Sequence, residues 1–239
     1  MNRRFISLLC AVCLSLSISA SAQASGNWSP EKTITGTDDV LVKFEKLYGI
    51  KPLTVENAYY NLDGITVQIN TVTTKSNEES VNVAERMSVA VRGTHPIIAR
   101  GSEVIEIRAN DVWAQQRALA HYDATGLQPV LLDKSDVPAD WKLEMLVFDN
   151  TKSAAMISAR MKLPVRAIAN QIFAVGGQKV QINYIKTAND PDKAKVIAIL
   201  KESGQTGRAV LSGKQGTPVE IIANNDNLLK QAKELFDKP

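Results

Sequence analysis

The chain has 239 residues, with 28 Lys and Arg against 25 Asp and Glu, and two Cys. Both Cys and two of the Arg lie in the first 24 residues, which read as an export signal, so the mature chain has no thiol and is close to neutral. This excludes disulfides and cysteine nucleophiles, and it leaves no overall positive field to attract nucleic acid or anionic lipid. About 215 mature residues suffice for one domain, or for two small ones, held by apolar cores alone.

Residues 1–24 have the three parts of a secretory signal peptide. Two arginines are followed by an apolar stretch over residues 6–18, and then by small residues that offer cleavage after Ala24 or, as second choice, after Ala22. The apolar stretch is shorter than the ~20 residues that a membrane-spanning helix needs. We therefore expect a periplasmic or secreted protein with no integral membrane segment after cleavage.

Residues 25–37 carry Gly, Ser and Thr without apolar periodicity, which predicts a flexible N-terminal segment. Residues 38–123 then predict a first repeat unit in the order α-β-β-α-β-β-α. The predicted elements are a helix over 39–48, strands over 55–62 and 66–73, a helix from 77, strands over 96–99 and 104–109, and a helix from 112 to about 122.

Residues 124–150 are too apolar for a flexible linker, and they contain two candidate strands, over 129–132 and 143–148. We interpret them as a strand-bearing connector that adds strands to one sheet or joins two sheets. A second repeat unit follows over residues 151–239.

The second unit repeats the element order of the first. Its predicted elements are a helix over 153–161, strands over 165–174 and 179–186, a helix from 190, strands over 208–212 and 219–223, and a last helix from 226. The sequence Val-Gln-Ile-Asn ends at Asn70 in the first unit and at Asn183 in the second. Because tight hairpins require antiparallel pairing, the chain is predicted to be α+β. It is a tandem duplication of an α-β-β-α-β-β-α unit with antiparallel sheets, each covered by helices on one face.

Few residues offer chemistry. The two histidines are His95, at a strand entry, and His121, which aligns with Leu235 of the other unit and is interpreted as a packing residue. Asp190 and Asp192 are interpreted as helix caps, because they lack the spacing of a calcium loop. The sequence predicts no catalytic residue, no metal site and no cofactor.

Two polar pairs recur at matching positions. Glu106 and Glu220 occupy equivalent strand positions, and alternation with isoleucine predicts that both face solvent. Gln68 and Asn70 share one strand face, as do Gln181 and Asn183. These four amides are the predicted binding residues, for sugar, for peptide or for each other across an inter-repeat seam.

The leading hypothesis is an exported, non-enzymatic interaction or assembly protein, accessory to a secretion or cell-envelope system, with a protein or envelope-polymer partner. The β-α-β-β-α order within each unit is similar to that of small modules that build rings in bacterial secretion machines, and to that of peptidoglycan-associated modules. A homo-oligomer is compatible with this hypothesis, and a nucleic-acid partner is not expected. Two alternatives stay open, namely a carboxylate-dependent hydrolase of cell-wall or polysaccharide material and a small-ligand-binding protein with a site between the repeats.

Overall fold

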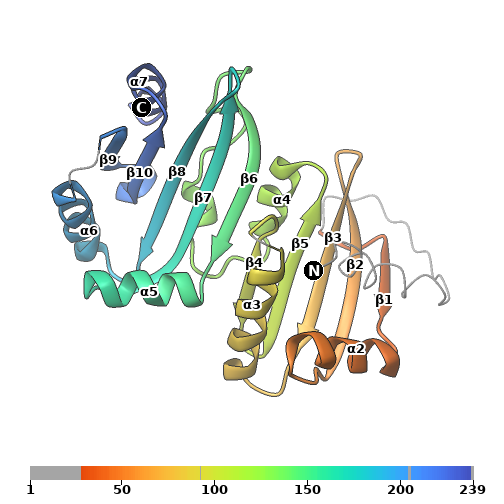
Figure 1. Ribbon diagram of the computed structural model, residues 1–239. Coiled ribbons are helices and arrows are strands. Elements are labelled where there is room, and N and C mark those ends of the chain that lie inside the picture. Colours follow the sequence, from red (N-terminus) through yellow and green to blue (C-terminus); the bar gives the residue numbers. More distant parts are fainter. Residues whose placement is uncertain (1–27, 92, 204–205, 238–239) are drawn as a thin grey trace.

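The computed structural model describes residues 28–91, 93–203 and 206–237 (Figure 1). The predicted signal peptide and its cleavage sites lie outside the described residues. Two five-stranded antiparallel sheets stand side by side, with strand orders β1-β2-β3-β5-β4 and β6-β7-β8-β10-β9 (Figure 1). The predicted α+β fold, with two similar antiparallel modules, is therefore confirmed.

The two modules have the same elements in the same order. The first contains β1 (Lys32–Thr35), α2 (Asp38–Tyr48), β2 (Thr54–Leu62), β3 (Ile65–Thr73), α3 (Asn77–Val91), β4 (Ile97–Arg100), β5 (Glu103–Ala109) and α4 (Val112–Leu119). The second contains β6 (Lys142–Asp149), α5 (Lys152–Met161), β7 (Val165–Val175), β8 (Gln178–Thr187), α6 (Asp190–Glu202), β9 (Arg208–Ser212), β10 (Pro218–Ala223) and α7 (Asp226–Glu234).

Each module begins one strand earlier than the sequence comparison predicts. Residues 32–35, within the segment expected to be flexible, form β1 against β2. Strand β6, in the predicted connector, holds the same place beside β7. The repeated unit is therefore β-α-β-β-α-β-β-α. A strand of four residues with a single buried side chain, Ile34, is too short to show its alternation in the sequence.

The other strand predicted in the connector does not form. Gln128–Val130 is a short 3₁₀ turn (η2) instead. Pro129 has no N–H to give to a sheet, and the N–H of Leu132 donates to the side chains of Gln171 and Tyr184, at 3.2 and 3.3 Å. The apolar residues of this stretch are buried, so it lines the core without joining a sheet.

Helices cover both faces of each sheet, where one covered face was predicted. In the first module α2 and α3 pack on the face that carries Val55, Val72 and Val104. Helix α4 packs on the opposite face, against Val67 and Ile69. The strands carry apolar side chains on both sides, so each face needs its own cover. In the second module α5 and α6 correspond to α2 and α3, and α7 corresponds to α4.

The two modules share one core on the α4 side. The ring centroid of Trp113 in α4 lies 6.1 Å from that of Phe173 in β7. At the neighbouring sheet edges, Asn150 uses its side-chain amide as a strand would, because its Oδ1 accepts from the Ala99 N–H at 3.1 Å and its Nδ2 donates to the Ala99 carbonyl at 2.8 Å. The edge of β4 is thereby capped at the end of β6.

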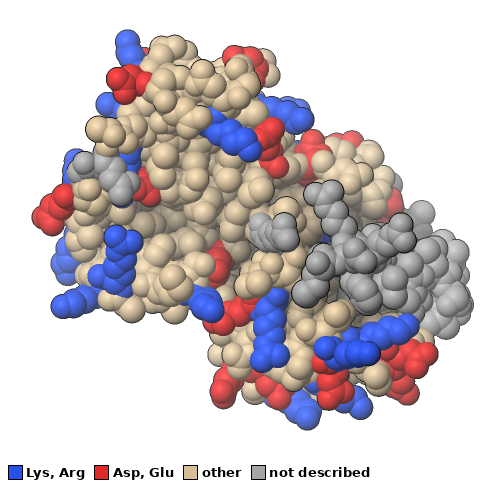
Figure 2. Space-filling view, in the orientation of Figure 1, with Lys and Arg blue, Asp and Glu red and all other residues tan. Residues whose placement is uncertain are grey.

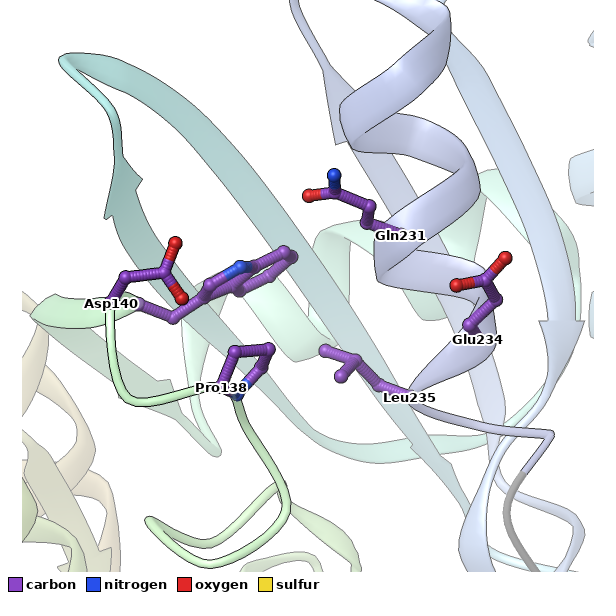
Figure 3. Close-up of a pocket in the computed structure, with 6 residues that line it drawn as sticks. Pro138, Asp140, Gln231, Glu234 and Leu235 are labelled. Atoms are coloured by element: carbon purple, nitrogen blue, oxygen red, sulfur yellow. The ribbon is translucent and has the colours of Figure 1, made fainter.

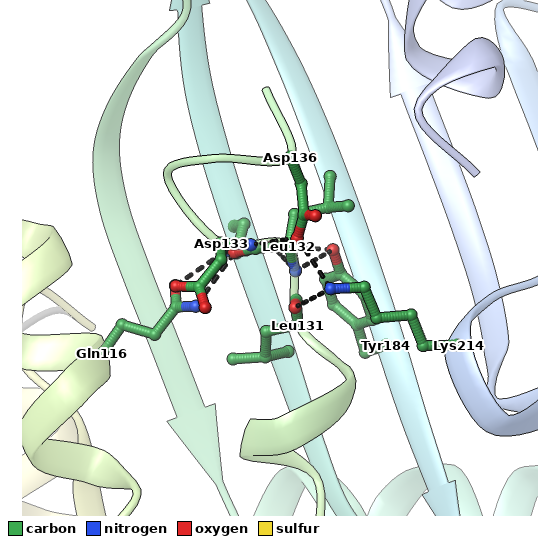
Figure 4. Close-up of polar contacts among 8 residues, drawn as sticks. Gln116, Leu131, Leu132, Asp133, Asp136, Tyr184 and Lys214 are labelled. Atoms are coloured by element: carbon green, nitrogen blue, oxygen red, sulfur yellow. Dashed lines mark hydrogen bonds and ion pairs between the residues drawn. The ribbon is translucent and has the colours of Figure 1, made fainter. Parts of the chain in front are cut away.

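A buried hydrogen-bond network centred on Gln171 completes the seam (Figure 4). The Gln171 Nε2 donates to Gln116 Oε1 in α4 at 2.7 Å and to the Leu132 carbonyl at 2.8 Å. Its Oε1 accepts from the Tyr184 hydroxyl at 2.6 Å and from the Leu132 N–H. Both amide hydrogens and both carbonyl lone pairs of a fully buried side chain are therefore used.

We predict that Gln171→Met lowers the free energy of unfolding by about 1–3 kcal/mol, because it leaves the Gln116 Oε1 and the Tyr184 hydroxyl hydrogen without their buried partner. Urea unfolding followed by circular dichroism measures this. Combining the change with Tyr184→Phe should cost less than the sum of the two single changes, since both act on one network. Asn82→Ala, at an exposed position of α3, is the control. Equal unfolding midpoints for Gln171→Met and the parent would contradict the prediction.

Candidate functional site

The four predicted binding residues lie at equivalent places in the two sheets. Gln68 and Asn70 stand on β3, on the face that α2 and α3 partly cover. Gln181 and Asn183 stand on β8, on the face that α5 and α6 partly cover. In both modules the two side chains are hydrogen-bonded to each other, with the Gln Nε2 donating to the Asn Oδ1 at 2.6 Å in the first and 2.7 Å in the second.

Each amide pair continues into a carboxylate on the neighbouring strand. The Asn70 Nδ2 donates to Glu106 Oε2 at 2.6 Å, and the Asn183 Nδ2 donates to Glu220 Oε2 at 2.8 Å. The register explains this, because Asn70 is opposite Glu106 and Asn183 is opposite Glu220. We call each chain of three side chains a Gln-Asn-Glu ladder.

The prediction that both glutamates face solvent is wrong for Glu106, which is only 5% exposed. Alternation along β5 does place Glu106 on the other face of the sheet from Ile105 and Ile107. That face is not open to solvent, because α2 and α3 cover it. Glu220 is half-buried and forms an ion pair with Arg208. Each glutamate is thus bonded to an asparagine of its own sheet, an arrangement that links strands. A glycosidase would instead need two acids that face one cleft.

The two ladders have different ionisable neighbours. Register places His95 of the first module where the second has Arg208, because Ile97 is opposite Glu106 and Val210 is opposite Glu220. Burial lowers the pKa of the His95 imidazole, an effect that the nearby Glu106 opposes. The first ladder therefore has an imidazole as its neighbour, with a pKa lowered by burial, and the second has a permanent cation.

Beyond the ladders, the same row of each sheet carries contrasting side chains. In the second module Met145, Ile172 and Ile222 flank Gln181 across four strands, and Ile222 is 39% exposed. We call this row the open apolar row. Figure 2 shows this side of the molecule, and the surface over β7 and β8 above α5 is hollowed and nearly free of charged atoms.

The matching row of the first module is basic and aromatic. Lys32, Tyr59 and Arg108 flank Gln68 in the same way. The Lys32 ammonium lies 5.9 Å from the centroid of the Tyr59 ring, within reach of a cation–π interaction. The equivalent rows of the two modules thus differ in chemistry, apolar in one and basic and aromatic in the other. The Gln-Asn-Glu ladder is the same in both.

His121 lies just after α4 and is exposed, whereas its aligned partner Leu235 is buried. The His121 ring stacks on that of Trp28, with the ring centroids 3.9 Å apart. Sequence reasoning missed the tryptophans. Trp28 precedes β1 and Trp141 precedes β6, and each packs on the equivalent aromatic residue of its own sheet, Tyr60 or Phe173. The equal spacing of the two tryptophans from the Val-Gln-Ile-Asn repeats was a signal that could have found them.

A cavity of about 310 Å³ lies beside Trp141, between the loop before β6 and helix α7 (Figure 3). Its lining residues are Pro138, Asp140, Trp141, Gln231, Glu234 and Leu235. The cavity therefore lies within the second module. One of the alternative hypotheses had expected a ligand site between the two repeats.

Within the described ranges, no group of three or more His, Cys, Asp or Glu residues is arranged to hold a metal ion. The acidic loop weighed for calcium is engaged by lysines, with Asp190 bound to Lys193 at 2.7 Å and Asp192 to Lys195 at 3.0 Å. The hydrogen bond from Lys193 lowers the pKa of the Asp190 carboxyl. In the same part of the chain, no helix is long and apolar enough to cross a membrane.

Comparisons with protein-family models, with curated proteins and with solved structures each found no match to this chain.

We predict that acid weakens the fold in part through its two histidines. Burial lowers the folded-state pKa of both His95 and His121, so the unfolded chain takes up protons first as the pH falls below about 6.5. Their contribution to stability is therefore present above that pH and is lost as the pH falls towards the lowered folded-state values. Urea unfolding of His95→Gln and His121→Gln at pH 7.5 and 5.5 should each show a smaller loss than the parent. Parallel losses in all three proteins would contradict this.

Proposed function

We propose that the chain is an exported, non-enzymatic interaction protein of the cell envelope, which holds a macromolecular partner against the parts of its two sheets that helices α2, α3, α5 and α6 leave uncovered. The observation that carries the proposal is the open apolar row of Met145, Ile172 and Ile222. Ile222 is exposed, and Met145 and Ile172 are half-buried. Apolar side chains grouped on a hollowed surface with few charges are typical of interaction sites.

The ladders support the proposal by fixing the strands beneath this surface. Each ladder crosses from β3 to β5, or from β8 to β10, with its polar atoms bonded inside the sheet. A rigid sheet loses little conformational freedom when a partner binds, which favours affinity from a flat surface. The glutamates that would serve the alternative hydrolase are occupied in these links.

The basic, aromatic row of Lys32, Tyr59 and Arg108 lies on the same side of the molecule, since α2, α3, α5 and α6 all lie on that side (Figure 1). A partner that spans both sheets would meet an apolar strip and a cationic strip. A protein with an acidic border around an apolar centre fits this pair of surfaces better than a uniformly charged polymer does.

We predict that Ile222→Lys abolishes partner retention. The change puts a charge at the β10 end of the open apolar row, on its most exposed side chain, where a bound partner would have to desolvate it. Tagged mature protein is incubated with envelope extract, and the retained partner is identified and then titrated against each purified variant. The expected loss of affinity is at least tenfold.

The matched control is Val89→Lys, which adds the same charge at a position of α3 that is 74% exposed. It should bind the partner as the parent does. Equal retention by Ile222→Lys and Val89→Lys, or a protein that stays monomeric and retains no partner, would refute the proposal.

Export has a direct test. Because the leader has the composition of a general secretion signal, we predict that cells expressing the full chain accumulate a mature form that begins at Ser25 or, as second choice, at Gln23. Mass spectrometry of the periplasmic fraction identifies the N-terminus. Replacement of Ala22 and Ala24 by Lys should leave the uncleaved precursor. A full-length chain confined to the cytoplasm would contradict the prediction.

A further inference from the structure

In the first module, the Trp28 side chain is enclosed by other residues of the same module. The Trp28 ring is stacked between Tyr60, at 4.2 Å, and His121, at 3.9 Å. Its indole Nε1 donates to the Tyr122 hydroxyl at 3.3 Å. Both ring faces and the polar atom of Trp28 therefore have protein partners.

In the second module the equivalent arrangement is built from different residues. Trp141, Leu235 and Phe236 take the places of Trp28, His121 and Tyr122. Phe236 has no hydroxyl, and within the described residues no group accepts a hydrogen bond from the Trp141 Nε1. Trp141 is only 4% exposed as a residue, but its Nε1 is not among the fully buried side-chain atoms that lack a partner, so this donor stays accessible. Trp141 lines the cavity, so one donor without a protein acceptor in the described residues lies beside it.

Other polar groups around this cavity are also unengaged. Asp140, Gln231 and Glu234 line it, and within the described part of the chain neither carboxylate forms an ion pair. Figure 3 shows Asp140 and Gln231 on opposite sides of the cavity, with Pro138 and Leu235 below them. The site therefore offers one donor, two anionic acceptors, one amide and two apolar contacts.

We propose that this cavity binds one unit of a saccharide. Sugar hydroxyls accept from an indole N–H and donate to carboxylates, so one ligand class satisfies both kinds of group. An ammonium or guanidinium group would satisfy the carboxylates alone, because it has no acceptor for Trp141. The C–H faces of a sugar ring suit Pro138 and Leu235. The volume of about 310 Å³ is at the lower end of ligand sites, as a single ring requires.

This site shares no residue with the open apolar row. The saccharide proposal is therefore tested independently of the proposed function. The chain offers its own internal controls, since its three tryptophans are Trp28, Trp113 and Trp141. Each indole N–H gives one proton–nitrogen NMR signal, and single Trp→Phe variants assign the three signals.

The test titrates the ¹⁵N-labelled mature chain with glucose, with N-acetylglucosamine and, separately, with arginine amide. The expected result is a saturable shift of the Trp141 indole signal with at least one sugar, while the Trp28 and Trp113 signals stay in place. A shift with arginine amide alone would overturn the saccharide class in favour of a cationic peptide. Failure of all three compounds to move the Trp141 signal would overturn the site.

Two variants separate binding from folding. Phe236→Tyr restores the hydroxyl that the first module has, so it should weaken sugar binding at least fivefold with an unchanged unfolding midpoint. Asp140→Asn combined with Glu234→Gln should weaken binding by a similar factor. Tyr122→Phe makes the reverse exchange in the first module and should leave sugar binding unchanged. Sugar affinity that is equal in Phe236→Tyr and the parent would also overturn the proposal.

Discussion

The architecture depends on one constraint, which is that helix α4 covers two sheets at once. Trp113 of this helix packs towards Phe173 of the second sheet, and Gln116 bonds to Gln171 at 2.7 Å in a fully buried network. A buried amide is costly unless every polar atom is paired, so this contact tolerates little change in the spacing of the modules. The capped edge of β4 adds a second fixed point at Asn150. The open faces of both sheets are therefore held in one orientation relative to each other.

Duplication lets the two modules keep what is structural and differ where the surface is exposed. Both copies retain the same Gln-Asn-Glu ladder, with the same donors and nearly equal bond lengths. The two copies differ in the side chains that share a register row with the ladder glutamine. The first copy has Lys32, Tyr59 and Arg108 in this row, and the second has Met145, Ile172 and Ile222. Because the ladder satisfies its own polar atoms, the neighbouring positions can change without leaving a buried group unpaired. The ladder is thus the support of a surface, and the sequence analysis had interpreted its amides as the surface itself.

The hairpins and amphipathic helices were predictable from sequence, because Gly-containing turns and apolar periodicity are local signals. Strand β1 was not, since its four residues are stabilised by β2 and not by their own pattern. The burial of Glu106 depends on α2 and α3, which contact it only in the folded chain. The cavity beside Trp141 was also hidden, because it results from residues about 90 positions apart that only the fold brings together. Sequence patterns therefore predict the local elements. The burial of Glu106 and the cavity beside Trp141 depend on contacts between residues far apart in the sequence.

Helix α7 differs from helix α4 in the residues of its outer face. Helices α4 and α7 begin at equivalent caps, with the side chains of Asp111 and Asn225 each accepting from the N–H three residues on. Counting from these caps, the seam residues Trp113, Gln116 and Leu119 correspond to Asn227, Lys230 and Lys233, all of which are exposed. Packing another sheet on α7 would bury two lysines without partners, which is strongly unfavourable. Helix α7 therefore lacks the surface through which α4 joins the two modules, and a second copy of the chain would have to associate elsewhere, through the sheet faces or the outer sheet edges.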